Sequence, residues 1–230
     1  MTSFKEVVEF IKEGIAPAQC VGCGGFGSWL CEDCRAEIVW VKQQHCYKCG
    51  KLSAYGKTCN NCRRVSKLTA LAVACYFDVG PIRTAIHAVK YGGVYELAPI
   101  LAGAFLAVVP EGVMGKSDWV VVPVPMTPAR FKERGYNQAE LMARDLADKL
   151  DLVILGGLLK IRVTEPQATL PRAQRLINLR GSMEAMGELA GLKVILVDDV
   201  ATTGATLEEC ARALREAGVK RVCGVVIARA

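Results

Sequence analysis

Two sets of side chains with strong ligand chemistry stand out in this chain of 230 residues. Eight of its eleven cysteines form four Cys-x-x-Cys pairs, and near the C-terminus the stretch KVILVDDVATTGATLEEC places two adjacent aspartates before a loop of threonine, alanine and glycine. Paired cysteines favour a thiolate-bound metal. A strand that runs through such a loop into a helix favours an anion. The sequence therefore indicates a metal-binding part and a separate ligand-binding part.

The cysteine pairs predict two structural zinc sites. A thiolate pair two residues apart grips a metal from one side, and two pairs complete a tetrahedron. Pairing in chain order is one arrangement, but interleaved or nested pairing is also compatible with the sequence. Disulfides are disfavoured in a reducing cytoplasm, and four pairs argue against redox catalysis by one of them. The expected zinc ligands are Cys20, Cys23, Cys31, Cys34, Cys46, Cys49, Cys59 and Cys62.

The acidic pair and its loop predict a ligand with two different ends. Backbone N–H groups at a helix N-terminus favour a phosphate, whereas Asp198 and Asp199 repel phosphate but accept hydrogen bonds from sugar hydroxyls. The Gly-Lys-Ser/Thr of a Walker loop and the glycine spacing of a dinucleotide fingerprint are both missing from this stretch. A ribose 5-phosphate fits both groups, because it has hydroxyls for the aspartates and a phosphate for the loop. Its phosphate would contact Ala201, Thr202, Thr203, Gly204, Ala205 and Thr206.

The elements that must position these groups follow from the pattern after residue 68. Continuous valine and isoleucine runs that alternate with helices favour a parallel sheet covered on both faces. In such sheets ligands bind at the carboxyl ends of the strands, where the aspartates after Val197 and the prolines after Val122 lie. We expect strands at 70–77, 118–125, 152–155, 193–199 and 221–228, and helices at 81–91, 96–109, 137–150 and 206–217.

The same pattern divides the chain into two domains. Residues 1–68 are expected to form an N-terminal helix and a double zinc module, and residues 69–230 an α/β domain. No acidic residue occurs at 38–77, where seven lysines and arginines lie, and the formal net charge is +6. Two zinc tetrathiolates would lower that charge to about +2, because each carries two negative charges. The cations either offset zinc-bound thiolates or form a nucleic-acid patch, and the sequence leaves both open.

Composition favours a globular protein without membrane insertion. Hydrophobic residues make up 52% and charged residues 23% of the chain. The longest apolar run, at 97–109, is shorter than the roughly 20 residues that a membrane span needs. The first ten residues lack the basic and apolar segments of a signal peptide. We therefore expect a cytoplasmic location.

The stretch VILVDDVATTGAT resembles the motif with which type I phosphoribosyltransferases bind 5-phosphoribosyl-1-pyrophosphate (PRPP). The resemblance implies that Asp198 and Asp199 hold the ribose hydroxyls and that the loop after them holds the 5-phosphate, with magnesium accompanying PRPP. The family's pyrophosphate loop corresponds to PVPMTPARFKERG, which we expect to form a rigid turn. This turn would supply Pro123, Val124, Arg130 and Arg134.

The resemblance also implies a mobile loop at 162–180. In type I enzymes a loop at this position closes over PRPP during transfer, and arginine there meets the charge that develops on departing pyrophosphate. Arg175 is the candidate in this chain, so Asp198, Asp199 and Arg175 form the candidate catalytic set.

Further motifs narrow the resemblance to the ComF family. VPVPMTPARFKERGYNQAELMA, YFDVGPIRTAIHAVKYGG and RVTEPQATLPRAQRLINLRG are similar to ComF segments, and the resemblance covers essentially the whole chain. ComF proteins carry a cysteine-rich zinc module before a phosphoribosyltransferase-like domain. Membership implies a type I phosphoribosyltransferase-like parallel sheet flanked by helices. It also implies a role in natural transformation, in which incoming single-stranded DNA is handled in the cytoplasm beside a DNA-uptake helicase or channel protein.

The sequence leaves the function open between alternatives. The chain either binds PRPP and handles single-stranded DNA, with the PRPP site as a sensor or a phosphate-backbone site, or it is a conventional phosphoribosyltransferase with a purely structural zinc module. No residue set identifies an acceptor. Lys90 is a candidate contact for pyrophosphate or DNA. Aromatic residues near the cations favour base stacking, namely Trp40, Tyr47, Tyr55, Phe131 and Tyr136.

Overall fold

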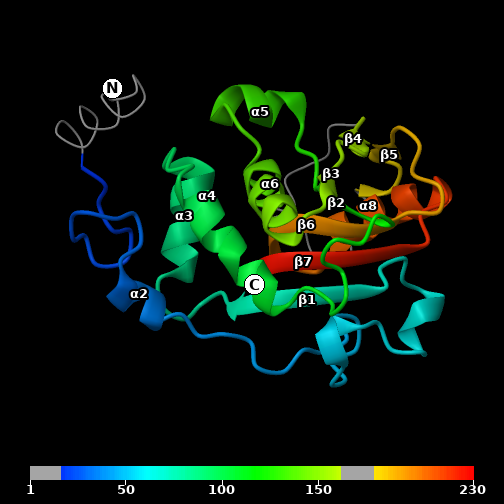
Figure 1. Cartoon of the computed structure of the whole chain (residues 1–230), viewed down its shortest axis with the longest axis horizontal. Coiled ribbons are helices and arrows are strands. Elements are labelled where there is room, and N and C mark those ends of the chain that lie inside the picture. The colour runs from blue at the N-terminus through cyan, green and yellow to red at the C-terminus, as the bar shows by residue number, and fades with distance from the viewer. Residues whose placement is uncertain (1–16, 162–178) are drawn as a thin grey trace.

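A sheet of five parallel strands organises the chain. The structure, a computed structural model, describes residues 17–161 and 179–230, so the predicted N-terminal helix and Arg175 lie outside the described residues. The strands lie in the spatial order β1-β7-β6-β2-β3, all parallel (Figure 1). This confirms the predicted parallel α/β sheet. The bounds are β1 (Ala70–Tyr76), β2 (Trp119–Pro123), β3 (Val153–Ile154), β6 (Lys193–Ala201) and β7 (Arg221–Arg229).

Apolar side chains project from both faces of the sheet, and a different set of elements packs on each face. Along β6, Ile195 and Val197 join one core, whereas Val194 and Leu196 join the other, as the two-residue period of a strand requires. The first core packs under α3 (Ile82–Tyr91), α4 (Leu97–Ala102), the 3-10 turn η3 (Gly103–Ala107) and α6 (Gln138–Leu150). The second packs under α8 (Ala205–Glu216) and a small antiparallel pair, β4 (Leu158–Lys160) with β5 (Met183–Ala185). No helix of the described residues is long and apolar enough to cross a membrane.

The cysteine-rich segment forms two ribbons that pack against the sheet beside its edge strand β1. The first ribbon (residues 20–34, with α2 at Glu32–Ala36) adds Cys20, Leu30 and Cys34 to the core under α3, and the second (residues 46–62, with η1 at Ala54–Gly56) adds Tyr47 to the core under α8. A further 3-10 turn, η2 (Cys62–Arg64), follows. The ribbons therefore lie on opposite faces of one sheet.

The segment between the ribbons covers the exposed edge of β1, as Figure 1 shows. Val41 N donates to Ala74 O at 2.9 Å, and the Gln44 side chain exchanges two hydrogen bonds with the Val73 backbone, at 2.7 and 3.0 Å. An unpaired edge strand is a template for aggregation. This segment satisfies the β1 backbone groups and joins the zinc ribbons to the sheet.

The structure differs from the sequence predictions in the helix predicted at 96–109 and in the stretch after β2. The predicted helix is divided into α4 and the 3-10 turn η3, which ends at Ala107. The stretch after β2, predicted as a rigid turn, contains the helix α5 (Pro128–Arg134). Thr127 caps this helix by accepting from Arg130 N at 3.3 Å, Pro128 occupies its first turn, and Gly135 ends it with φ of 82°. These are ordinary start and stop signals for a helix. The helix is short, and it has too few apolar residues to show a helical period in the sequence.

Candidate metal and ligand sites

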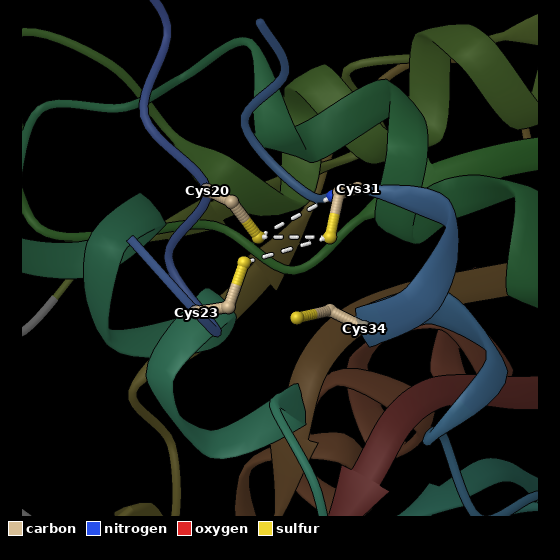
Figure 2. Close-up of side chains that lie close together, drawn as sticks. All are labelled: Cys20, Cys23, Cys31 and Cys34. Carbon is tan, nitrogen blue, oxygen red and sulfur yellow. Dashed lines mark hydrogen bonds between the residues drawn. The ribbon is translucent and has the colours of Figure 1, made fainter. Parts of the chain in front are cut away.

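The eight paired cysteines gather into two groups of four. In each group the sulfur atoms lie within 4.8 Å of one another. Figure 2 shows the four sulfur atoms of the first group pointing toward one another, from the turn at 20–23 and from the start of α2. The sequence left the pairing open, and the structure pairs the cysteines in chain order. The first group is Cys20, Cys23, Cys31 and Cys34, and the second is Cys46, Cys49, Cys59 and Cys62.

The chemistry of both groups fits zinc. Although burial works against the thiolates, backbone hydrogen bonds, among them Cys31 N to Cys20 Sγ (3.4 Å) and Cys59 N to Cys46 Sγ (3.5 Å), lower the pKa of Cys20 and of Cys46 to about 6. The side-chain hydrogen bond with Cys59, in which the Cys62 thiol is the donor, instead raises the pKa of Cys62 to about 12, together with burial. A divalent cation would compensate the crowded negative charge and make four thiolates compatible. The donor set suits a closed structural zinc site.

The two aspartates face opposite sides of the sheet. Asp199 follows Ile195 and Val197 onto the α3 face, where its Oδ1 lies 2.9 Å from Lys90 Nζ. Its Oδ2 is buried and has no hydrogen-bond partner among the described residues. Asp198 follows Leu196 onto the α8 face and borders the loop. The sequence predicted that both aspartates hold the ribose hydroxyls, and the strand period turns their side chains to opposite faces.

The predicted loop forms a small cavity, here called the phosphate cup. Its volume is about 30 Å³, enough for a compact group rather than a nucleobase, since a water needs roughly 10–15 Å³. Gly204, with φ of 76°, starts α8, and Ala205 N donates to Thr203 Oγ1 at 3.3 Å. The first N–H groups of a helix have no intrahelical partner and attract an anion. The lining comprises Asp198 and residues 200–207, which include all six predicted loop residues.

A second cavity, the cation cavity, gathers three of the predicted basic residues. Arg130 and Arg134 lie four residues apart on α5 and hence on one face, and Lys90 reaches the same space from α3. The Arg134 guanidinium lies 5.4 Å from the centre of the Tyr91 ring. The volume is about 460 Å³, and the lining is Lys90, Tyr91, Gly93, Arg130, Glu133, Arg134 and Tyr136.

Two other predicted contacts, Pro123 and Val124, lie elsewhere. Val124 is buried; its N–H donates to Val197 O at 2.9 Å and its carbonyl accepts from Asn137 Nδ2 at 3.0 Å. The Val124 backbone is thus fully used within the fold, and Pro123 borders a different cavity beside α5. Asn137 also accepts from Ala139 N at 3.1 Å and caps α6. These residues shape the turn after β2 rather than line either cavity described above.

The environment of Asp198 predicts a stability effect. Burial and the charge of Asp199 raise the pKa of Asp198 to about 8, although Lys90 acts in the opposite direction. A raised carboxyl pKa lowers the free energy of unfolding as pH rises from about 4, its unfolded value, to about 8, because ionisation is disfavoured only in the folded state. We expect Asp198→Asn to raise the Tm of the ligand-free protein by about 2–4 °C or more at pH 8, and by less at pH 5.

Calorimetric unfolding at both pH values tests this expectation. Asp145→Asn on α6 is the matched control, since Asp145 pairs with Lys149 at 2.6 Å away from both cavities. A variant at position 198 that melts at or below the wild-type temperature at pH 8 would contradict the assignment.

Sequence reasoning misjudged one aromatic residue and missed one acid. Tyr47 was expected to stack on bases, but only 4% of its surface is exposed, so it is unavailable for stacking. Trp40 and Phe131 remain 45% and 48% exposed. Glu208, buried in the first turn of α8, contacts the second ribbon and carries no recognisable motif. Only the fold brings Glu208 and Tyr47 together, because they are 161 residues apart.

Comparisons with known proteins agree with the architecture. Residues 12–63 match the family model of the double zinc ribbon domain, and residues 136–230 match that of the phosphoribosyl transferase domain. Competence protein F of Haemophilus influenzae is 29% identical, with 92% of this chain and 97% of that protein covered. Competence protein ComFC of Bacillus subtilis is 28% identical (82% and 79% covered), and DNA utilization protein YhgH of Salmonella typhimurium is 27% identical (84% and 87% covered).

These matches extend over most of the chain and join the two domain types in the order that the motifs predicted. The predicted ComF relationship is confirmed: the chain is a homologue of Competence protein F and ComFC, with a double zinc ribbon followed by a phosphoribosyl transferase domain.

Proposed function

We propose that this chain binds PRPP at the carboxyl end of β6. One observation carries the proposal, namely the order of the groups around that strand end. Asp198 borders the phosphate cup, and its neighbour Asp199 pairs with Lys90, which lines the cation cavity. Cup, carboxylates and cations thus follow one another in the order of 5-phosphate, ribose and pyrophosphate in PRPP.

Each part of the ligand finds a suitable chemical partner in this arrangement. The N-terminus of α8 suits the 5-phosphate. A ribose hydroxyl would supply the hydrogen bond that the buried Oδ2 of Asp199 lacks among the described residues. Lys90, Arg130 and Arg134 suit the pyrophosphate. Magnesium is commonly held by one or two carboxylates together with substrate phosphates, and Asp198 is the carboxylate available for it.

Titration calorimetry with PRPP and magnesium tests the site. We expect the double variant Asp198→Asn/Asp199→Asn to bind at least 100-fold more weakly, because Asp199 loses its charge and Asp198 loses the carboxyl group that would bind magnesium. Asp145→Asn should bind like the wild type, and the Tm of each variant checks folding. Undiminished affinity of a folded double variant would refute the assignment.

We further propose that the protein handles single-stranded DNA in the cytoplasm during DNA uptake, beside a helicase or channel protein. The relatives named for competence and DNA utilization support this role, as does a basic hollow of about 660 Å³ near the amino ends of β1 and β7. The hollow lies at the opposite end of the strands from the phosphate cup, and most of its cations are exposed. It is lined by Lys57, Arg63, Ser66, Lys67, Leu68, Thr69, Arg212, Arg215, Glu216, Lys220 and Arg221.

The salt dependence of DNA binding tests the hollow. Each phosphate contact with a single strand contributes a slope of about −0.7 to log K against log salt. Lys57→Gln with Lys220→Gln should therefore weaken binding of an oligonucleotide at low salt and reduce the slope by about 1.4. Lys116→Gln, an exposed cation outside the hollow, is the control. An unchanged slope in the double variant would show that the DNA does not contact the hollow.

A conventional phosphoribosyltransferase is the second candidate function. The cation cavity favours it, since Lys90, Arg130 and Arg134 would also stabilise pyrophosphate as it leaves. In this case Arg175, which lies outside the described residues, would assist the departure of pyrophosphate. Pyrophosphate release from PRPP, measured with and without single-stranded DNA, separates binding from turnover.

A further inference from the structure

The Tyr47 side chain of the second zinc ribbon contacts the loop that lines the phosphate cup. Tyr47 lies between Cys46 and Cys49, two expected zinc ligands, and its side chain is buried in the core beside α8. A Cβ atom added at Gly204 would lie 3.3 Å from two carbon atoms of the Tyr47 ring, so the ring packs directly against the loop. Tyr47 thus links the metal-binding turn to the residue that starts α8.

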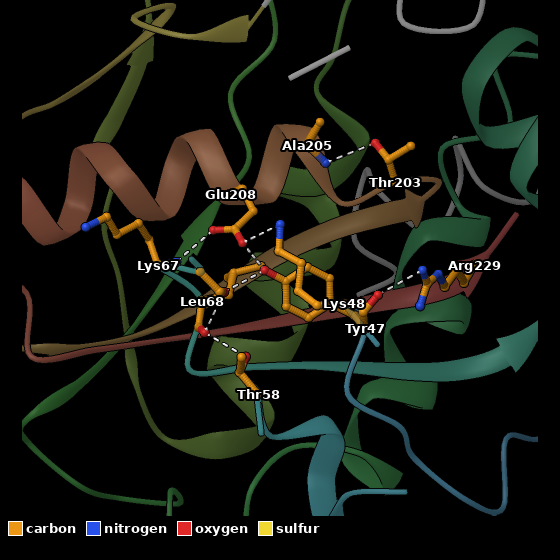
Figure 3. Close-up of polar contacts among 10 residues, drawn as sticks. Tyr47, Lys48, Thr58, Lys67, Leu68, Thr203, Ala205, Glu208 and Arg229 are labelled. Carbon is orange, nitrogen blue, oxygen red and sulfur yellow. Dashed lines mark hydrogen bonds and ion pairs between the residues drawn. The ribbon is translucent and has the colours of Figure 1, made fainter. Parts of the chain in front are cut away.

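Glu208 joins this contact from the helix side. Its carboxylate accepts hydrogen bonds from the Tyr47 hydroxyl and, at 2.9 Å, from Lys67 N, and Lys48 Nζ lies 3.1 Å away. Figure 3 shows Glu208 on α8 reaching these groups of the ribbon and of the segment after it. Although burial works against the charged form, the partners hold the pKa of Glu208 below its usual value. The carboxylate is therefore charged and fully engaged.

The charge of Glu208 matters for an anion in the phosphate cup. A carboxylate in the first turn of a helix competes with a phosphate for the positive end of the helix dipole. Here Lys48 offsets that charge and two donors hold the carboxylate at the ribbon. The Tyr47 backbone is fixed as well, since Arg229 Nη2, at the end of β7, donates to Tyr47 O at 3.1 Å. The ribbon thus supports the loop by contact and by charge compensation.

We propose that zinc in the second ribbon is coupled to phosphate in the cup through Tyr47 and Glu208. Zinc fixes the turn that carries Tyr47; the Tyr47 ring then supports Gly204, and its hydroxyl holds Glu208. Both are positioning residues, and the inference rests on the proposed function, in which the cup holds the 5-phosphate of PRPP. Coupling between two sites is reciprocal. Zinc therefore tightens PRPP binding, and PRPP raises the zinc affinity of the second ribbon by the same factor.

The first experiment needs no PRPP. Hydrogen exchange of the loop amides at 202–207 is compared between Cys62→Ser, which disables the second zinc site, and Cys34→Ser, which disables the first site on the other face of the sheet. We expect loop exchange to rise at least tenfold in Cys62→Ser and less than twofold in Cys34→Ser. No increase, or an equal increase in both variants, would overturn the coupling.

The second experiment leaves the cysteines intact and covers the case in which Cys62→Ser fails to fold. Tyr47→Phe keeps the ring and loses the hydroxyl, whereas Tyr47→Ala loses both; Val21→Ala alters the residue at the same place in the first ribbon. By calorimetry with PRPP and magnesium, we expect affinity to fall about threefold in Tyr47→Phe, at least tenfold in Tyr47→Ala, and not at all in Val21→Ala. Equal affinity in all three variants would count against the coupling.

Zinc affinity provides the reciprocal readout. In equilibrium competition with a chromophoric chelator, PRPP should raise the affinity for one of the two zinc ions in the wild type but not in Tyr47→Ala. If PRPP does not bind the wild type, the proposed function fails, and the loop exchange experiment still decides whether zinc and loop are coupled. If PRPP binds and changes the affinity for neither zinc ion, the coupling is wrong while the PRPP site stands.

Discussion

Removal of both zinc ions should lower the Tm of the whole chain by roughly 10 °C or more, not merely loosen the ribbons. Structural zinc binds small peptides with about 10–16 kcal/mol, which is comparable with the whole stability of a typical domain. The ribbons also share their cores with the sheet, since Cys20, Leu30 and Cys34 pack under α3 and Tyr47 under α8. Losing about 4 kcal/mol of this support accounts for a shift of that size.

Elemental analysis should first give two zinc ions per chain, and thermal unfolding before and after chelation then measures the effect. Zinc added back should restore the Tm, whereas magnesium should not, because thiolates select zinc over hard cations. Full removal of zinc with an unchanged Tm would show that the ribbons hold without metal, and the structural role of the two cysteine groups would be wrong.

Much of this architecture could be predicted from local sequence. The apolar runs of β2, β6 and β7 are long and continuous, so their burial in a parallel sheet is evident without coordinates. The loop before α8 could also be located from the sequence, since its glycine and threonines lie next to one another in the chain. The cysteine pairs likewise indicate two metal sites, because the two cysteines of each pair lie close together in the chain.

What could not be predicted depends on contacts between distant segments. The pairing of the cysteine groups requires knowing which turns meet, and no local signal encodes this. Asp198 and Asp199 read as one unit in the sequence, but the strand extends through both and turns them to opposite faces. Tyr47 is an aromatic residue beside cations and was therefore a candidate for base stacking. Its burial under α8 depends on how the second ribbon packs on the sheet.

The two ribbons are better understood as parts of the sheet domain than as an appendage. They contribute to the cores on both faces, and the segment between them completes the hydrogen bonding of β1. The second ribbon pairs with the start of β1, where Thr58 N donates to Thr69 O at 2.9 Å. A defect at this junction should therefore destabilise the whole chain, not the ribbon alone.

Gly56→Ala is expected to be the most damaging single substitution at this junction. Gly56 adopts φ of +64°, and a Cβ there would lie 2.0 Å from the Leu71 carbonyl oxygen on β1, so the ribbon must move away from the strand. The left-handed backbone alone costs about 1–2 kcal/mol; with the clash we expect a loss above about 4 kcal/mol, a size reached only by severe packing defects.

Gly50→Ala in the same ribbon separates strain from clash. Gly50 has φ of +74°, and a Cβ at this position meets no atom of the described residues within 4 Å, so the variant should lose only the backbone cost. Chemical denaturation of both variants, with zinc content measured in each, gives the comparison. Because Gly56 lies against β1, its variant should lower the unfolding midpoint of the entire chain in one transition. Equal losses for the two variants, or a separate early transition confined to the ribbon, would show that the ribbon is not an integral part of the sheet domain.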